Sequence, residues 1–382
     1  MQYRKIKATH IFDGYQMLDS NNVLITQYDG TVEAIVAEVD AGNDIEIYEG
    51  IICPGFVNAH CHIELSHLYN CIPQGIGLVN FIIQILQQRA APAEVKWQAM
   101  QQAASELYAT GTVAVGDICN TVDSLRLKNN SNLYWHNFIE VSGFAPPTAQ
   151  QRYNDMQAVQ QQFNQLSANN AIVPHAPYSV STALFTLINN QATQKIISIH
   201  NQEASCENEF LQAKAGNFVR LYQHLGVDIA NYQPAAATSF QHWLPLLSQA
   251  ATIISVHNSF ITEPDLVYAQ QRKANQQLYF CLCPNANLYI ENCMPPVPLL
   301  MAYKANIVIG TDSYASNSKL NMYSEILTLQ QHFATLPLAT ILQWATLNGA
   351  KALGIQKQYG SFEKNKKCGV VLIDGLTAKR LC

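Results

Sequence analysis

Two histidines with one residue between them, His60 and His62, end an apolar stretch that begins at Pro54. Residues i and i+2 of a strand point to the same face. We therefore expect both imidazoles to leave one side of a strand at its carboxyl end. Imidazole is a common ligand for zinc and iron, so the pair could supply two ligands to one metal. Two loop histidines without a ligand are the alternative for this motif taken alone.

Other single polar residues stand at or near the ends of short apolar runs. They are Asp117, Glu140, His175, His200, His257 and Asp312. With the runs before His60 and at 278–283 these make eight strand-like segments, and helical stretches such as 93–109, 150–166 and 322–333 lie between them. Strands that alternate with helices predict βα units and a parallel sheet. The expected fold class is α/β, a (β/α)8 barrel whose function lies at the carboxyl ends of the strands.

The composition restricts the partners of this chain. It has 382 residues, 13% of them charged, and a formal net charge of −5. Without a basic stripe we expect no nucleic acid as partner, and without an apolar stretch of about 18 residues we expect no membrane span. The amino terminus lacks the apolar core of a signal peptide. The ten cysteines lie mostly in apolar runs, where reduced thiols pack well, so we expect a cytoplasmic protein.

Residues 1–53 differ from the rest of the chain. They contain short strand-like runs separated by Asp-Gly and Gly-Asn pairs, which is typical of antiparallel hairpins. The segment 369–375 looks like another strand of this kind. We expect residues 1–53 and 363–382 to form a small β-domain, with the barrel at 54–362 inserted between them.

Most of the residues at the strand ends are of types that commonly bind metals. The set that could hold a divalent transition metal with an open water position consists of His60, His62, His200, His257 and Asp312. Such a metal would lower the pKa of its water towards about 7. Glu203 follows His200 by three residues, so it could reach that water if a helical turn begins there. The alternative for Glu203 is a first-turn glutamate that stabilises a helix start.

Five segments match, in order, the signatures of the amidohydrolase superfamily. They are Pro54-Gly-Phe-Val-Asn-Ala-His-Cys-His62, His200-Asn-Gln-Glu203, Val256-His-Asn258, Cys283-Pro-Asn-Ala-Asn287 and Gly310-Thr-Asp312. More narrowly, they resemble the chlorohydrolase, guanine deaminase and S-adenosylhomocysteine deaminase branch. The motifs span nearly the whole chain.

This resemblance implies a distorted (β/α)8 barrel with a small β-sandwich formed from both termini. It implies one divalent metal, with zinc favoured and iron as the alternative. The residues that match the ligand positions are His60, His62, His200 and Asp312. The implied catalytic residues are Glu203 as a proton shuttle, His257 as the group that steadies the nucleophile, and Asp312. Dinuclear relatives carry a lysine at the end of strand four, where this chain has His175, so we favour one metal.

His62-Ile63-Glu64 also opens the signature of the unrelated zinc nucleobase deaminases, but the required P-C-x-x-C is absent. The run from His62 to Ser66 instead resembles an aminodeoxyfutalosine deaminase-like subgroup. That resemblance implies that Glu64 and Ser66 face the substrate, whereas the alternative for Glu64 is a carboxylate at a loop entrance. His175 matches a family position that contacts substrate, with a hydrogen-bonded rim histidine as the alternative. Asp117 and Glu140 could support the ligands or form salt bridges.

The leading hypothesis is hydrolytic deamination of an amino-substituted heterocycle, a purine-like base or nucleoside, with aminodeoxyfutalosine among the options. The small-molecule substrate is the expected partner, and a homodimer is one option for the oligomeric state. The second hypothesis is hydrolysis of a carbon–chlorine or cyclic carbon–nitrogen bond on the same metal. A third, a non-catalytic barrel that serves as an interaction module, is disfavoured because the ligand set is complete.

Overall fold

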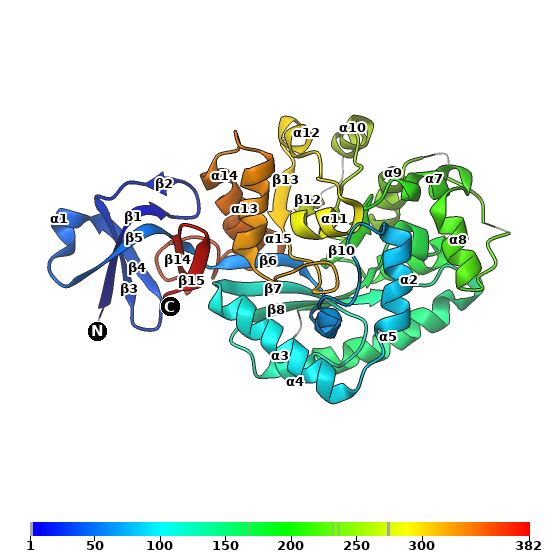
Figure 1. The fold of residues 1–382 in the computed structure, drawn as a ribbon, viewed down its shortest axis with the longest axis horizontal. Helices are drawn as coiled ribbons and strands as arrows, with labels where there is room; N and C mark the ends of the chain where they lie inside the picture. The colour runs from blue at the N-terminus through cyan, green and yellow to red at the C-terminus, as the bar shows by residue number, and fades with distance from the viewer. Residues whose placement is uncertain (1–2, 168, 231, 236, 273–275) are drawn as a thin grey trace.

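A computed structural model describes residues 3–167, 169–230, 232–235, 237–272 and 276–382. A small sheet built from both ends of the chain lies at one side of a larger unit in which strands alternate with helices (Figure 1). Among the described residues, no helix is long and apolar enough to cross a bilayer.

The larger unit contains two parallel four-stranded sheets in chain order. The first holds β6 (Phe56–Cys61), β7 (Thr112–Cys119), β8 (Tyr134–Val141) and β9 (Asn170–Pro174), and the second holds β10 (Ile196–Asn201), β11 (Thr252–His257), β12 (Gln277–Leu282) and β13 (Asn306–Ile309). All eight predicted strand-like segments are strands, and the α/β class is confirmed. The predicted closed barrel is present only in part, because the strands of the described chain form two separate ladders that are joined at their edges only by isolated contacts. Cys61 and Asp312 form one isolated parallel bridge, and the His200 amide donates to the His175 carbonyl oxygen at 3.0 Å.

Helices follow most of these strands. They are α2 (Leu78–Gln88), α3 (Ala93–Ala109), α4 (Leu125–Asn129), α5 (Ala149–Asn164), α6 (Thr182–Asn190), α7 (Cys206–Ala213), α8 (Asn217–His224), α9 (Ser239–Trp243), α10 (Glu263–Gln271), α11 (Pro284–Glu291), α12 (Val297–Ala302), α13 (Met322–His332), α14 (Leu338–Gln343) and α15 (Gly349–Ala352). The helix predicted at 93–109 has these bounds, and those predicted at 150–166 and 322–333 differ by at most two residues at either end. A 3-10 turn, η1 (Ile63–Leu68), follows β6.

The small sheet has seven strands in the order β15-β14-β5-β1-β3-β4, with β2 on β1. Their bounds are β1 (Tyr3–Phe12), β2 (Met17–Leu18), β3 (Asn22–Gln27), β4 (Val32–Ala37), β5 (Ile45–Pro54), β14 (Val370–Asp374) and β15 (Thr377–Arg380), with the short helix α1 (Glu38–Ala41) after β4. Strands from both ends of the described chain share this sheet. The antiparallel hairpin expected in residues 1–53 is present, because β3 pairs with β4 in antiparallel register, whereas β1 pairs with β5 in parallel. All seven strands belong to one sheet, so the expected sandwich of two facing sheets is not confirmed.

Specific contacts fix the small sheet against the larger unit. Arg380 on β15 donates to the Tyr108 carbonyl oxygen at 3.0 Å and to the Thr112 carbonyl oxygen at 2.5 Å. Gly111, which lies between these two residues, has φ +97°, and a Cβ there would stand 2.4 Å from Val371. The turn into β7 therefore needs a glycine, because β14 packs directly against it.

Candidate active site

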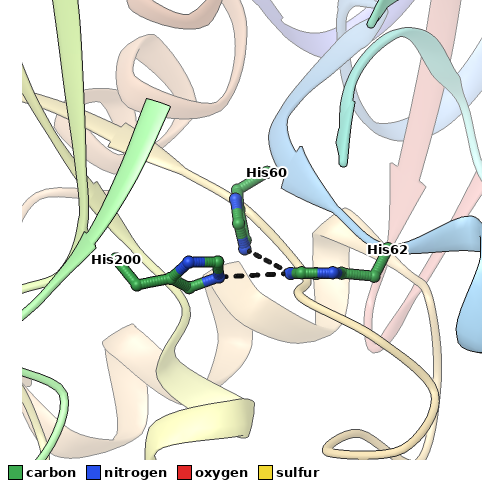
Figure 2. Close-up of side chains that lie close together, drawn as sticks. All are labelled: His60, His62 and His200. Carbon is green, nitrogen blue, oxygen red and sulfur yellow. Dashed lines mark hydrogen bonds between the residues drawn. The ribbon is translucent and has the colours of Figure 1, made fainter. Parts of the chain in front are cut away.

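Three imidazoles converge where the first and second parallel sheets meet. His60 is the last residue but one of β6, His62 directly follows the strand, and His200 lies near the end of β10. The His62 Nε2 atom is 3.1 Å from His60 Nε2 and 3.2 Å from His200 Nε2 (Figure 2). The prediction that the two histidines of the pair share one side of their strand is confirmed.

The spacing of these atoms fits a metal. Zinc–nitrogen bonds of about 2.0–2.1 Å in a tetrahedron place two ligand nitrogens about 3.3 Å apart. Asp312 Oδ1 adds a fourth ligand atom, 3.5 Å from His60 Nε2 and 3.3 Å from His62 Nε2. Three nitrogens and one carboxylate oxygen are therefore gathered at distances that a single ion would span.

The protonation states of the three histidines also fit a metal site. Burial lowers the pKa of His60 and of His62 to about 3, so both rings are neutral at physiological pH. His200 Nδ1 lies 2.8 Å from the His175 carbonyl oxygen, which can only accept, so Nδ1 carries the proton. Its Nε2 lone pair is thereby left free towards the other two rings, as metal ligation requires.

The local backbone places Asp312 next to His60. Gly310 lies against His60 so closely that a Cβ would stand 2.8 Å from the histidine carbonyl oxygen. Asp312 then adopts φ +57°, a left-handed conformation that costs free energy in a non-glycine residue. Ser316 donates a short hydrogen bond to the second carboxylate oxygen of Asp312. Asn58 binds Thr311 through both its amide nitrogen, at 2.8 Å, and its amide oxygen, at 3.1 Å.

Glu203 lines the same cavity, but the backbone that places it there is not the helical turn that we expected. The helix α7 begins only at Cys206, and Gln202 has φ +46°, so the chain turns sharply rather than helically after His200. Glu207 accepts the amides of Gln202 at 2.9 Å and Glu203 at 2.7 Å. The glutamate that supports this helix start is therefore Glu207, which leaves the Glu203 carboxyl group free for the cavity.

Burial, together with the negative charges of Asp312 and Glu207, raises the pKa of Glu203 well above its usual range. Its Oε1 lies 3.5 Å from His257 Nε2. His257 ends β11 with φ +71°, and its Nδ1 lies 2.8 Å from Asn287 Oδ1. The amide group of Asn287 is itself oriented, because its nitrogen donates to Ser259 at 2.9 Å.

Asn287 is therefore a functional residue that sequence reasoning missed. It holds His257 with the proton on Nδ1, so that Nε2 faces the cavity as an acceptor. The signal was present in the Cys283–Asn287 motif, whose last asparagine lies in the first turn of α11, just after β12.

A cavity of about 570 Å³ opens above these groups. The candidate ligands His62, His200 and Asp312 line it together with Glu203 and His257. Helix α2 contributes an apolar wall that includes Leu78, Phe81, Ile82 and Ile85, and two arginines, Arg89 and Arg152, also line it. This size and this mixture of apolar walls with a few polar groups are typical of small-molecule sites.

Glu64 and Ser66 are not among the residues that line this cavity. Glu64 accepts the amides of Asn120 at 3.1 Å and Thr121 at 3.0 Å and the Ser124 hydroxyl at 3.1 Å. Ser66 donates to the Ile63 carbonyl oxygen at 2.7 Å within its own turn. These contacts fit the loop-entrance alternative for Glu64, and the substrate role remains a prediction.

The sequence leaves the roles of three residues open, and the structure places each of them differently. Asp117 forms an ion pair with buried Lys128, with Nζ and Oδ2 2.5 Å apart. Glu140 lies beside the cluster, with Oε2 3.5 Å from His200 Nδ1. His175 lines the cavity, and its Nδ1 lies 2.7 Å from the Ser179 hydroxyl.

Glu140, His175 and His200 have ligand atoms within 4.8 Å of one another, which resembles a second metal group. It shares His200 with the first group. Because the His200 Nδ1 proton already points to the His175 carbonyl oxygen and towards Glu140, this arrangement fits a carboxylate that orients a metal-ligating histidine.

The Amidohydrolase family model matches residues 51–381, and the chain belongs to this family. The 5-methylthioadenosine/S-adenosylhomocysteine deaminase of Syntrophobacter fumaroxidans is 23% identical over 367 residues, which cover 90% of this chain and 77% of that protein. The structure of Helicobacter pylori aminofutalosine deaminase in complex with methylthio-coformycin has a TM-score of 0.82 at 21% identity, covering 97% and 92% of the two chains. An adenosine deaminase from Xanthomonas campestris with bound zinc has a TM-score of 0.69 at 22% identity, covering 97% and 84%.

Proposed function

We propose that this chain is a metal-dependent hydrolytic deaminase of a purine-like base or nucleoside, which replaces a ring amino group by oxygen and releases ammonia. The observation that carries the proposal is the meeting of three neutral imidazoles, one carboxylate and the buried Glu203 at one cavity. When bound by His60, His62, His200 and Asp312, a divalent metal supplies a water with a pKa near 7. The deaminase names of the relatives support the reaction class.

Glu203 is the proposed proton shuttle. It is buried and has a raised pKa, so it can hold a proton at physiological pH and donate it. A nearby cation would favour its ionised form, which would let it first accept the proton of the attacking water. Glu203 would then pass this proton to a ring nitrogen of the substrate.

His257 and Asp312 are the proposed partners of Glu203. Because Asn287 holds the proton of His257 on Nδ1, its Nε2 presents a lone pair that can accept a hydrogen bond from the nucleophile. The hydrogen bond with His60 and the neighbouring imidazoles outweigh burial and hold the pKa of Asp312 well below its usual range. A carboxylate that stays ionised can both ligate the metal and accept a proton later in the reaction.

We propose zinc as the metal. Three imidazole nitrogens and one carboxylate oxygen also suit iron, but the Xanthomonas campestris relative was solved with bound zinc. A single ion is favoured, because the second ligand group depends on His200, which the first group already uses.

The domain bounds, the cellular compartment and the substrate contacts are also part of this proposal. We assign catalysis to the barrel at 54–362 and place a small β-sandwich at 1–53 and 363–382. We keep the cytoplasm as the compartment, because all ten cysteines are free thiols and most are buried. The substrate contacts assigned to His175, Glu64 and Ser66 are likewise proposed, with His175 best supported because it lines the cavity.

Ammonia release tests the proposed function directly. Zinc-loaded protein is incubated with adenosine, 5′-methylthioadenosine, S-adenosylhomocysteine, aminodeoxyfutalosine and guanine, with the His200→Ala variant as the control. We expect at least one amino-purine compound to yield stoichiometric ammonia with the wild type and none with the variant. Turnover of a chlorinated heterocycle without deamination of any compound in the panel would favour the second hypothesis instead.

A further inference from the structure

A buried glutamate on α13 contacts two segments that carry groups of the candidate active site. Glu325 is in the first turn of this helix and is 0% exposed. Its carboxyl group accepts two hydrogen bonds from Asn285 and one from Asn317. Burial raises its pKa to about 8 although these bonds lower it, and a carboxyl group can accept in either protonation state. A fully buried carboxyl group is costly unless it is well paired, so its contacts indicate its role.

The first contact of Glu325 holds the start of α11. Within the described structure, the N-cap residue of α11 makes no side-chain capping bond, and the next residue, Pro284, has no N–H group. The Asn285 amide is therefore the first donor of the helix, and it donates to Glu325 Oε2 at 2.9 Å. Glu325 thus caps α11 from a neighbouring helix. Asn287, which holds His257, lies two residues further along the same turn.

The second contact of Glu325 holds the peptide group that precedes Asp312. Asn317 Nδ2 donates to Glu325 Oε1 at 2.7 Å and to the Thr311 carbonyl oxygen at 2.9 Å. The N–H of the same peptide group donates to the His60 carbonyl oxygen at 3.1 Å. This peptide group is therefore held from both sides. The left-handed conformation of Asp312 needs such support, because strained conformations persist only where their surroundings fix them.

The alternative role for Glu325 is support of its own helix. An acidic residue in a first turn stabilises a helix start through the helix dipole. The start of α13 already has a cap, because the Asn321 side chain accepts the Tyr323 amide at 2.9 Å. The carboxyl group of Glu325 instead reaches across to α11 and to the loop after β13.

We propose that Glu325 is a positioning residue for the deamination, and that it holds His257 and Asp312 in register. One arm runs through Asn285 to the first of these residues, and the other runs through Asn317 to the second. The inference rests on the proposed function, in which both residues act at one reaction centre. Groups that act together must be held to within about 0.5 Å, and one carboxyl group bound to both segments links their positions.

Glu325→Gln tests the arm to α11. The glutamine oxygen can still accept from both asparagine side chains, but its NH2 group then faces the Asn285 amide, and two donors repel each other. We expect kcat of the zinc-loaded protein to fall by about tenfold to a hundredfold, with KM changed less than about twofold and the metal content unchanged. The NMR signal of the His257 Nδ1 proton, assigned with a His257→Phe variant, should shift, and this readout needs no activity assay.

Asn317→Ala tests the arm to Asp312. It removes the link between Glu325 and the Thr311 carbonyl oxygen and leaves the cap of α11 in place. The visible absorption of bound Co²⁺ depends on its coordination geometry, so protein loaded with Co²⁺ reports the position of the candidate ligand. We expect this spectrum to change and the affinity for Co²⁺ to fall by about tenfold. This variant also tests the proposal if Glu325→Gln does not fold.

Asn321→Ala is the matched control, because it removes the cap of the helix that carries Glu325 but none of the contacts of Glu325. It should lower the Tm and leave kcat, the His257 signal and the Co²⁺ spectrum unchanged. A fall in kcat as large as that of Glu325→Gln would show that Glu325 only stabilises its own helix.

Two other results would overturn the proposal. They are an unchanged His257 signal in Glu325→Gln and an unchanged Co²⁺ spectrum in Asn317→Ala. If the wild type deaminates no compound of the panel, the proposed function fails, and these two spectra still decide whether Glu325 positions the two segments.

Discussion

Burial sets opposite protonation states for neighbouring residues of the candidate site. It lowers the pKa of His60 and His62, which keeps their lone pairs available, and it raises the pKa of Glu203, which favours a bound proton. One desolvated cavity thus provides both metal ligands and a group that can carry a proton. This division of roles follows from position, because His62 and Glu203 line the same cavity and His60 lies directly beside His62.

Replacement of Glu203 by glutamine should stop catalysis while the metal site is kept. The amide is nearly isosteric but cannot accept a proton, and general acid–base groups contribute about 10²–10⁴-fold. We expect kcat to fall by that factor with unchanged metal content. Glu209→Gln, at an exposed position on the following helix α7, is the control. A loss of less than tenfold would contradict the shuttle role.

Glu64→Ala distinguishes the two roles of Glu64. The variant removes three hydrogen bonds that hold the chain after β7, from Asn120, Thr121 and Ser124. We expect the free energy of unfolding to fall by about 1–3 kcal/mol and kcat/KM to fall equally for a nucleoside and its free base. Unchanged stability with a loss confined to the nucleoside would instead show that Glu64 contacts the substrate.

The strand β7 and the helix α4 are joined by a buried ion pair that supports the metal strand. Asp117 pairs with Lys128 through one oxygen, and its other oxygen accepts the Ile63 amide at 2.8 Å. Ile63 follows His62 directly, so this pair fixes the backbone next to the candidate metal ligand His62.

Lys128→Met should therefore be strongly destabilising. Removal of one partner of a buried pair costs about 3–5 kcal/mol, because the other charge stays buried alone. The double variant Lys128→Met/Asp117→Asn should recover part of the loss, since the amide is uncharged and can still accept from Ile63. Lys96→Met, which breaks the exposed pair with Asp123, should cost about 0–1 kcal/mol. Equal losses in urea unfolding for the two single variants would refute this account.

The sequence predicts the strand ends well because buried parallel strands are continuous apolar runs, and the first polar residue marks the edge of the sheet. His200, His257 and Asp312 were found by this signal. The strand β1 was not predicted, because the alternation of polar and apolar residues that marks a half-buried strand covers only residues 5–9 and is broken by Arg4-Lys5 and Ile11-Phe12 at its ends. The orientation of Glu64 depends on a loop 56 residues away, so no local pattern could reveal it.

At the scale of the whole molecule, the candidate metal ligands come from both parallel sheets. His60 and His62 belong to the first sheet, whereas His200 and Asp312 belong to the second. An ion held by all four would add a link between two sheets that meet at this edge through one isolated bridge and a few hydrogen bonds rather than a continuous ladder.

Removal of the metal should consequently lower the melting temperature. An ion that binds only the folded chain, present at 100 times its Kd, adds about 2.7 kcal/mol to the free energy of unfolding. We expect chelation to lower the Tm and added zinc to restore it. A His62→Ala variant should melt at the same temperature with and without chelator, and a chelation effect as large as that of the wild type would contradict the ligand assignment.

The central claim is that His60, His62, His200 and Asp312 hold a single divalent metal, and elemental analysis of the metal-saturated, desalted protein tests it most directly. The account predicts close to one zinc per chain in the wild type and nearly none in His62→Ala. Two tightly bound ions per chain, or an unchanged metal content in the variant, would contradict it.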